Sequence, residues 1–189
     1  MRCIVFSNNV KKAIELEAYL SSVCLDVFLY RDIVSDVIDV VEDGATFSEN
    51  AIKKVQALHF LDKDILLADD SGLEVVALGG KPGVFSARYG GSLLTDYERC
   101  QFLLDQMDSV VDRRAQLVCV IAIQWPNGLL ETVKGVVKGR VATHLSGESG
   151  FGYDPIFIPD GYDHSFARLG PLIKQKISHR SQALDEIKN

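Results

Sequence analysis

The first third of the chain alternates short apolar runs with amphipathic stretches, a pattern typical of strand–helix–strand units. Residues 2–6 predict a short buried strand, and residues 25–30 predict a second strand. Between them we expect a helix over about 10–22, because apolar residues recur on one face at the spacing i, i+4, i+7. These residues are Leu16, Leu20 and Val23.

A second helix and two further strands are expected next along the chain. Thr46-Phe47-Ser48-Glu49 has the spacing of a capping box at the start of a helix. The apolar face of that helix is formed by Ala51, Val55 and Leu58. The run 65–68 predicts a short buried strand that ends at Asp69-Asp70, and we expect residues 73–78 to form a return strand closed by Gly79-Gly80.

The rest of the chain contains a clear hairpin signal. Residues 115–124 and 129–138 flank Pro126-Asn127-Gly128, as in two antiparallel strands joined by a tight turn. Around this hairpin we expect a helix over 95–107, a glycine-rich loop from Gly147 to Asp154 and a short helix from Ser181. The combination predicts an α/β fold with a mixed β-sheet. With 189 residues, the chain is expected to form a single domain, 1–189, or two closely packed lobes.

Composition narrows the class of protein. Hydrophobic residues make up 47% of the chain, which is enough for a buried core. The formal net charge of −6 disfavours nucleic acid and anionic membranes as partners but is compatible with a small phosphate ligand, because local charge can oppose net charge. The apolar run 2–6 is too short for a signal peptide, and Leu117–Ile123 is far short of a membrane span. The four cysteines form no CxxC pair, so we expect buried reduced thiols in a cytoplasmic protein.

A polar turn between the first strand and the first helix is a candidate phosphate site. The residues are Ser7-Asn8-Asn9-Val10-Lys11-Lys12. Backbone N–H groups at the start of a helix, together with two lysines, favour phosphate binding. An ordinary cap with solvated lysines is the alternative, and the GxxxxGK[ST] pattern of a P-loop is missing.

Acidic residues supply candidates for metal binding and base catalysis. Asp69-Asp70-Ser71-Gly72 follows an apolar strand, and strand alternation points its two carboxylates to opposite faces. One of them can bind Mg²⁺ and accept a proton from water, or the sequence is simply an Asp-Ser-Gly turn. Glu49 is either a second Mg²⁺ ligand opposite Asp70 or the reciprocal residue of its own capping box. Lys54 is either a ligand-binding or a solvated lysine.

The second half of the chain offers groups suited to an aromatic, anionic ligand. In Gly150-Phe151-Gly152-Tyr153-Asp154-Pro155, the glycines allow close backbone approach, Phe151 offers a stacking face and Asp154 an acceptor. Lys174 precedes Ser178-His179-Arg180, a basic group in an acidic protein. The alternative is a structural loop with a core aromatic and solvated cations.

Taken together, these motifs resemble the inosine triphosphate pyrophosphatase family, and its bacterial members in particular. The similarity runs from about residue 2 to 188 and rests on blocks that stand in the family's order. The blocks are Ser7-x-Asn9-x-x-Lys12, Phe47-x-Glu49-Asn50-Ala51, Ala68-Asp69-Asp70-Ser71-Gly72-Leu73, Leu78-Gly79-Gly80-x-Pro82-Gly83, Ser86-Ala87-Arg88-Tyr89, Gly150-Phe151-Gly152-Tyr153-Asp154-Pro155 and Ser178-His179-Arg180. Asn8 stands where bacterial members often have glycine, and since Asn tolerates positive φ, we expect it to preserve the turn.

The resemblance implies an elongated mixed β-sheet with flanking helices, two lobes around a substrate cleft, a homodimer and Mg²⁺ as cofactor. The implied reaction converts ITP, dITP or XTP to the monophosphate and pyrophosphate. Asp70 would be the general base and a metal ligand, with Glu49 as a further ligand. Ser7 to Lys12 and Lys54 would hold the phosphates, and Ser71 would touch the substrate. The base and adjoining phosphates would be surrounded by Phe151, Gly152, Tyr153, Asp154, Lys174, His179 and Arg180.

Base choice follows from hydrogen-bonding edges. Hypoxanthine and xanthine carry a 6-oxo acceptor and an N1–H donor, whereas adenine carries the reverse. A donor such as Arg180 or a backbone N–H at the 6-oxo edge, with a carboxylate such as Asp154 near N1, would reject adenine by leaving buried groups unpaired. Two other interpretations stay open: a Maf-type pyrophosphatase with other base specificity, which Ser178-His179-Arg180 argues against, and a nucleotide-binding module without turnover. A Ser or Cys nucleophile is disfavoured, since no GxSxG pattern occurs.

Overall fold

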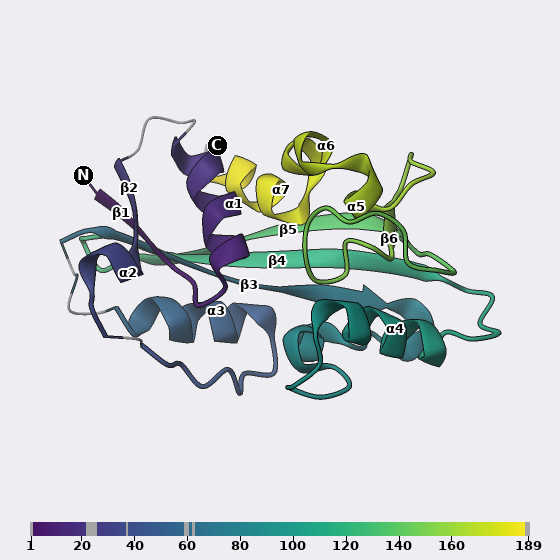
Figure 1. Ribbon diagram of the computed structural model, residues 1–189. Helices are drawn as coiled ribbons and strands as arrows, with labels where there is room; N and C mark the ends of the chain where they lie inside the picture. The colour runs from purple at the N-terminus through teal and green to yellow at the C-terminus, as the bar shows by residue number, and fades with distance from the viewer. Residues whose placement is uncertain (1, 22–25, 37, 59–60, 62, 188–189) are drawn as a thin grey trace. The chain divides into compact units, whose positions relative to one another are not determined.

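The computed structural model describes residues 2–21, 26–36, 38–58, 61 and 63–187, which form a mixed sheet with flanking helices (Figure 1). Its strands are β1 (Arg2–Phe6), β2 (Asp26–Leu29), β3 (Ile65–Val75), β4 (Arg114–Gln124), β5 (Leu130–Val141) and β6 (Phe157–Pro159). Its helices are α1 (Val10–Ser21), α2 (Tyr30–Ile33), α3 (Phe47–Gln56), α4 (Asp96–Gln106), α5 (Phe166–Leu169), α6 (Pro171–Ile177) and α7 (His179–Glu186). The strand order is β2-β1-β3-β4-β5-β6; β1 is parallel to β2 and β3, and β5 is antiparallel to β6.

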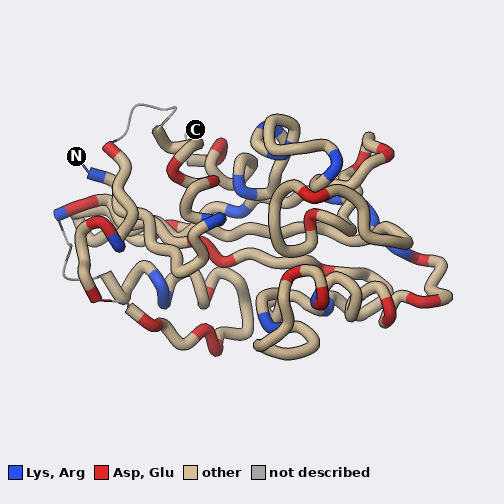
Figure 2. Tube along the Cα trace, viewed as in Figure 1, with Lys and Arg blue, Asp and Glu red and all other residues tan. Residues whose placement is uncertain are grey.

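The chain divides into two compact units. Unit 1 comprises Met1–Asp70, Cys119–Gly135 and Arg180–Asn189, and unit 2 comprises Ser71–Val118 and Val136–His179. The boundary falls inside β3, β4 and β5. Lys and Arg are interspersed with Asp and Glu along the chain (Figure 2). Among the described residues, no helix combines the length and apolar character needed to cross a membrane.

In unit 1, helices cover both faces of β1 and β3. Figure 1 shows α1 and α7 on one face and α3 on the other. The face toward α1 and α7 carries a core of Cys3, Val5, Leu16, Leu20, Ile65, Leu67, Cys119, Ile121, Ile123, Ala183 and Leu184. In β3 the members of this core are odd-numbered, because successive side chains of a strand alternate between faces.

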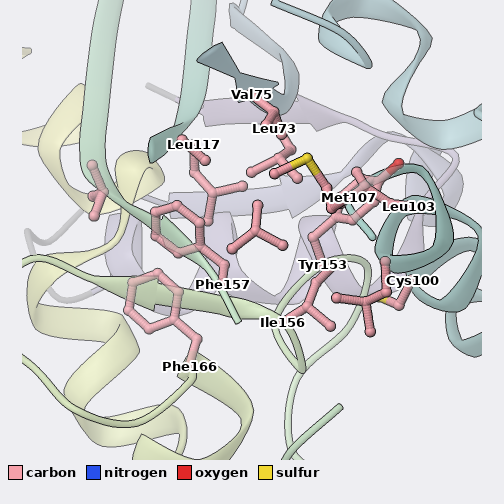
Figure 3. Close-up of a cluster of buried hydrophobic side chains, with 14 residues drawn as sticks. Leu73, Val75, Cys100, Leu103, Met107, Leu117, Tyr153, Ile156, Phe157 and Phe166 are labelled. Atoms are coloured by element: carbon pink, nitrogen blue, oxygen red, sulfur yellow. The ribbon is translucent and has the colours of Figure 1, made fainter. Parts of the chain in front are cut away.

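Unit 2 has its own hydrophobic core, in which α4 packs against strand residues (Figure 3). From α4 come Cys100 and Leu103, and from β3 come Leu73 and Val75, all with no exposed surface. The rings of Phe157 and Phe166 stack in the same cluster with centroids 5.7 Å apart. This core ends beside the glycine-rich loop, since it also includes Tyr153, Ile156 and Phe157.

Most of the predicted elements are confirmed. Strands 2–6 and 25–30 correspond to β1 and β2, the helix over 10–22 to α1, the helix over 95–107 to α4, and the hairpin to β4 and β5. Gly128 has φ +83°, and the N–H of Trp125 bonds the carbonyl of Leu129 across the turn. The last helix begins at His179, two residues before the predicted start. Val23 and Cys24 lie outside the described residues, while Cys3, Cys100 and Cys119 are free and buried as expected.

The predicted break at Asp69-Asp70 is wrong. β3 runs without interruption from Ile65 to Val75, and residues 76–78 form a 3₁₀ turn rather than the end of a return strand. A buried carboxylate is costly when it is unpaired, but pairing with a cation offsets that cost. Here lysine and arginine side chains contact both of them, so the strand continues through the acidic pair.

Candidate active site

Asp69 and Asp70 are buried in the middle of β3, with 2% and 4% of their surface exposed. Strand alternation sends their side chains to opposite faces, as the sequence predicted. Asp69 shares the face of Ile65 and Leu67, which packs against α1 and α7. Asp70 therefore points toward α3, and the two carboxylates have separate surroundings.

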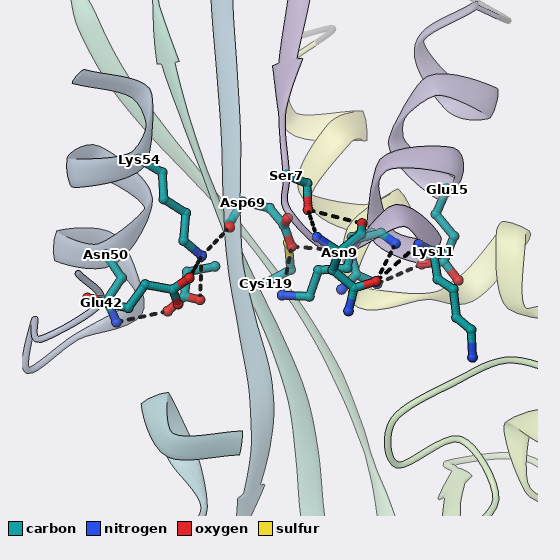
Figure 4. Close-up of polar contacts among 12 residues, drawn as sticks. Ser7, Asn9, Lys11, Glu15, Glu42, Asn50, Lys54, Asp69 and Cys119 are labelled. Carbon is teal, nitrogen blue, oxygen red and sulfur yellow. Dashed lines mark hydrogen bonds and ion pairs between the residues drawn. The ribbon is translucent and has the colours of Figure 1, made fainter. Parts of the chain in front are cut away.

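The Asp70 carboxylate is held by two residues of α3. Lys54 Nζ lies 3.0 Å from Asp70 Oδ1, and Asn50 Nδ2 donates to Oδ2 at 3.2 Å. Lys54 also donates to the backbone carbonyl of Asp69 at 3.0 Å and forms an ion pair with Glu42 Oε1 at 3.0 Å. Figure 4 shows Lys54 reaching from α3 to the strand, with Glu42 and Asn50 beside it. Two carboxylates thus meet at one ammonium group.

Burial sets the protonation behaviour of this group. Burial raises the pKa of Asp70 above the ordinary range of an aspartate, and the charges of Lys54 and Lys12 offset part of that rise. Burial alone would lower the pKa of Lys54, but the carboxylates, Asp70 first, outweigh it and raise this pKa. Lys54 therefore stays protonated, and Asp70 is a stronger base than a solvated carboxylate.

On the opposite face, Asp69 gathers two cations. Its Oδ2 lies 3.6 Å from Lys12 Nζ and 3.3 Å from Arg180 Nε, and Cys119 Sγ contacts the same atom at 3.9 Å. Arg180 also donates from Nη1 to Glu15 at 2.6 Å. Asp69 thus contacts both Lys12 of α1 and Arg180 of α7. Asp69 and Arg180 are 111 positions apart in the chain.

The turn that precedes α1 is closed by its own side chains. Asn9 Oδ1 accepts from the N–H groups of Lys11 at 3.0 Å and Lys12 at 3.2 Å, and Ser7 Oγ bonds the backbone of Asn9 at 3.2 Å. Asn9 therefore caps α1. Because these N–H groups are bonded to the cap, the lysine side chains are the better candidates for phosphate contacts. Lys11 and Val10 are exposed, and Lys12 is half-buried.

Glu49 bonds to the backbone just before its helix. Its N–H donates to Thr46 Oγ1 at 3.1 Å, and its carboxylate accepts from the N–H of Ala45 at 2.7 Å. The capping interaction is thus present, although its reciprocal bond goes to Ala45 and not to the N-cap itself. The side chain is exposed, and its role in metal binding stays a prediction.

Glu42 and Asn50 are site residues that the sequence reasoning missed. Asn50 stood inside a recognised block, but only its fully buried position facing Asp70 gives it a role. Glu42 lies in an irregular acidic stretch, and nothing in its local sequence distinguishes it from its neighbours. Its ion pair with Lys54 is a tertiary contact that local pattern does not encode.

Glu42 and Asp70 are the carboxylates beside Lys54 that could hold a magnesium ion. Each places a carboxylate oxygen 3.0 Å from Lys54 Nζ, so the two carboxylates face the same point. Within the described part of the chain, no group of three or more His, Cys, Asp or Glu side chains is arranged to hold a metal. Mg²⁺ typically takes one or two carboxylates and completes its shell with water and substrate phosphates, so two are sufficient.

In unit 2 the structure brings together Phe151, Asp154 and Lys174. Lys174 Nζ lies 2.6 Å from Asp154 Oδ2 and 4.2 Å from the centroid of the Phe151 ring. Asp154 Oδ2 also accepts from the N–H of Phe151 at 2.8 Å. Asp154 and Lys174 are only 3% and 5% exposed. Their ion pair holds the Lys174 ammonium group over the ring of Phe151.

Two residues of α4 contact the loop that carries Phe151. Asp96 accepts from the N–H of Gly152 at 2.9 Å, and Cys100 Sγ contacts the carbonyl of the same residue at 3.2 Å. Tyr153 is buried and donates to the carbonyl of Ser86 at 2.9 Å, so its hydroxyl supports the fold. Gly150 has φ +83°, and a Cβ there would lie 2.1 Å from Asp154 Oδ2. The loop therefore requires this glycine for two reasons.

The remaining predicted residues are divided between the units. Ser71 is half-buried on β3 and His179 is buried at the start of α7, both in unit 2. Arg180 belongs to unit 1, where its contacts are with Asp69 and Glu15. Arg180 thus groups with Lys12, which favours a role toward phosphates over the role toward the base edge that the sequence reasoning gave it.

The sequence matches the model of the Ham1 family over residues 3–189. Two curated relatives are dITP/XTP pyrophosphatases. The protein of Staphylococcus epidermidis is 43% identical over 182 residues, which cover 96% of this chain and 91% of the relative. The protein of Oceanobacillus iheyensis is 37% identical over 188 residues, which cover 98% and 95%.

This chain is also similar to solved structures of Ham1 proteins. The Ham1 protein of Staphylococcus aureus superposes with a TM-score of 0.87 at 40% identity, covering 99% of this chain and 96% of that one. A HAM1 protein of Coxiella burnetii superposes with a TM-score of 0.85 at 38% identity, again covering 99% and 96%.

Proposed function

Because this chain belongs to the Ham1 family, we propose that it hydrolyses deaminated purine nucleoside triphosphates, namely ITP, dITP and XTP, to the monophosphate and pyrophosphate. The observation that carries the proposal is the buried Asp70 carboxylate, contacted by Lys54, in a chain 43% identical to a dITP/XTP pyrophosphatase. Removal of such nucleotides from the cellular pool is the biological role that follows.

Unit 1 supplies the groups suited to a triphosphate. Lys12, Lys54 and Arg180 are cations held in place by buried carboxylates, so they are ordered before substrate arrives. Ordered cations in a site of low exposure interact with phosphates more strongly than solvated lysines do. Lys11, which is exposed on the first turn of α1, adds positive charge near the same turn.

Asp70 and Glu42 are the residues that would hold Mg²⁺. When bound, Mg²⁺ offsets the negative charge of the triphosphate and orients the phosphoryl group. The exposed Glu49 remains a candidate ligand from the family resemblance, and its substitution is compared with that of Glu42 below.

Asp70 acts as the general base. A water molecule attacks the α-phosphorus in line with the bond to the bridging oxygen, which breaks to release pyrophosphate. The proton of that water passes to the Asp70 carboxylate, whose raised pKa makes it a better acceptor. Lys54 and Asn50 fix the carboxylate oxygens, so the base keeps one orientation during the reaction.

Phe151, Asp154 and Lys174 are the groups suited to the base of the nucleotide. Phe151 provides a stacking face, and Lys174 and Asp154 provide a donor and an acceptor. The 6-oxo group of hypoxanthine accepts from a donor such as Lys174, and its N1–H donates to an acceptor such as Asp154. Adenine presents a donor and an acceptor in the opposite order, so both contacts are lost or become repulsive.

A nucleotide panel with Mg²⁺, scored for pyrophosphate release, tests the proposal. Hydrolysis of ITP, dITP and XTP well above that of ATP is the expected result. A Maf-type enzyme would prefer other bases, and a binding module would release no pyrophosphate. We also propose, from the family resemblance, that the protein is a homodimer in the cytoplasm, and light scattering coupled to size-exclusion chromatography tests the oligomeric state.

A further inference from the structure

The side chain of Asn8 joins the turn before α1 to a distant stretch of chain. Its Nδ2 donates to the carbonyl of Ile38 at 3.0 Å, and its Oδ1 accepts from the Tyr30 hydroxyl and from Arg31 Nη2 at 3.3 Å. Asn8 does not have the positive φ expected from the sequence, since Ser109 is the one non-glycine residue with positive φ among those described. The asparagine therefore matters for its amide group and not for its backbone.

The acceptor side of this amide rests on a fixed platform. Tyr30 has no exposed surface, and its ring packs on Phe6 with centroids 4.6 Å apart. Arg31 Nε donates to the Tyr30 hydroxyl at 3.2 Å, and its guanidinium lies 5.8 Å from the ring centroid. Both polar atoms of the Asn8 amide are thus engaged within unit 1.

The segment 38–46, to which Asn8 is bonded, has neither helix nor strand and carries Glu42. Near its other end it is tied to α3, through Glu42 on Lys54, Asp43 on Lys53, and the N–H of Gly44 on Asn50. Ile38 is four residues from Glu42, so a fixed Ile38 confines Glu42 to a radius of about 14 Å at full extension.

We propose that Asn8 is a positioning residue that holds segment 38–46 against the turn before α1 and thereby orders Glu42 for the metal. The inference rests on the proposed function of Glu42 and Asp70 as metal carboxylates. A carboxylate on irregular chain has to be ordered when the ion binds, and prior ordering strengthens binding. The affinity for the ion then depends on a side chain that does not touch it.

The test compares Asn8→Ala with Asn127→Ala, a matched control that removes an asparagine acceptor bonded to the N–H of Leu129 in the β4–β5 turn. Mn²⁺ binding to the nucleotide-free protein is followed by electron paramagnetic resonance, and backbone order by hydrogen–deuterium exchange. Asn8→Ala is expected to raise the Mn²⁺ dissociation constant about tenfold, the effect of losing a modest hydrogen-bonded restraint. It should also speed exchange across residues 38–46, while Asn127→Ala does neither.

Further variants keep the test decisive. Asn8→Asp retains the acceptor for Tyr30 and Arg31 but loses the bond to Ile38, so it should reproduce the metal effect even if the alanine variant folds poorly. A higher KM for nucleotide with unchanged Mn²⁺ binding and unchanged exchange would instead place Asn8 on the phosphates and overturn the proposal. Absence of pyrophosphate release by the wild type would sink the proposed function, while the exchange experiment would still decide whether Asn8 orders the segment.

Discussion

At the scale of single residues, the clearest feature is the division of labour between Asp69 and Asp70. Adjacent positions on a strand face opposite ways, so one carboxylate meets Lys54 and Asn50 while the other meets Lys12 and Arg180. Asp70, on the face of Lys54 and Glu42, is the carboxylate proposed as the general base. Asp69 instead holds two cations in place, a role that the sequence left undecided between structure and catalysis.

Asp70→Asn is expected to abolish turnover without unfolding the protein. The change removes the proton acceptor at almost constant volume, and loss of a general base lowers rates by about 10²–10⁴-fold before any effect on the metal is added. Pyrophosphate release and circular dichroism measure the two effects. A folded variant with near-wild-type activity would exclude Asp70 from the mechanism.

Glu42→Gln and Glu49→Gln separate two candidate metal ligands. Glu42 faces Lys54 and Asp70, so its neutralisation is expected to raise the Mg²⁺ concentration for half-maximal rate by about tenfold or more. Glutamine at position 49 can still accept from the N–H of Ala45, so little change is expected there. Magnesium titrations of pyrophosphate release compare the two variants. The reverse ranking would return the ligand role to Glu49.

At the scale of elements, β3 carries both carboxylates of the candidate site. At Gly72 the strand passes very close to Ser86 and Gly83. A Cβ at this position would lie 2.3 Å from Ser86 Oγ and 2.5 Å from the carbonyl of Gly83. The same Ser86 hydroxyl accepts from the N–H of Leu73 at 2.9 Å and donates to Gly83. The strand therefore has no room for a side chain at position 72, two residues after Asp70.

Gly72→Ala is expected to lower the free energy of unfolding by about 1–3 kcal/mol, as overpacking of a buried site does. Urea denaturation measures this change. Ser71→Ala is the control, because Ser71 is the neighbouring half-buried position on the same strand and should cost less. Equal denaturation midpoints for wild type and Gly72→Ala would mean that the Gly83–Ser86 turn moves freely.

At the scale of the whole molecule, a net charge of −6 coexists with ordered cations beside the acidic pair of β3. Lys12, Lys54 and Arg180 are each paired with buried or half-buried carboxylates. Such pairing allows cations to stay at positions of low exposure in an acidic protein. The proposed triphosphate ligand carries more negative charge than these carboxylates do. Substrate choice then depends on the base, because the phosphates are common to every nucleotide.

Variants of the residues proposed to contact the base and of those proposed to contact the phosphates should therefore affect substrate preference differently. Two lost contacts of about 1–3 kcal/mol each give the wild type a preference for ITP over ATP on the order of 10²-fold or more. Lys174→Ala is expected to reduce this ratio, because it removes the donor proposed for the 6-oxo edge. Lys12→Ala is expected to lower kcat/KM for both nucleotides alike.

The ratio of kcat/KM for ITP over ATP, measured for wild type and each variant, checks this prediction. Arg180→Ala serves as the third variant, and its contacts with Asp69 and Glu15 predict that it behaves like Lys12→Ala. A ratio altered by Arg180→Ala and not by Lys174→Ala would restore the assignment of Arg180 to the base edge.

Local sequence determined most of the secondary structure and the composition of the site. Apolar periodicity placed α1 and α3, because periodicity reflects which face is buried, and the Pro126-Asn127-Gly128 turn placed the β4–β5 hairpin. The caps at Asn9 and Thr46 followed from residue type, since their bonds span only two or three positions. The motif order also gave the family resemblance that the match over residues 3–189 bears out.

Only the tertiary structure decided which of these residues act together. In β3, the charges of Asp69 and Asp70 are offset by Lys54, Lys12 and Arg180, and those partners lie 16 to 111 positions away. Glu42 joined the site by the same kind of contact. Such long-range pairs are formed by the packing of α1, α3 and α7 on the sheet. A local pattern encodes the face that a residue presents, but the partner on that face depends on the fold.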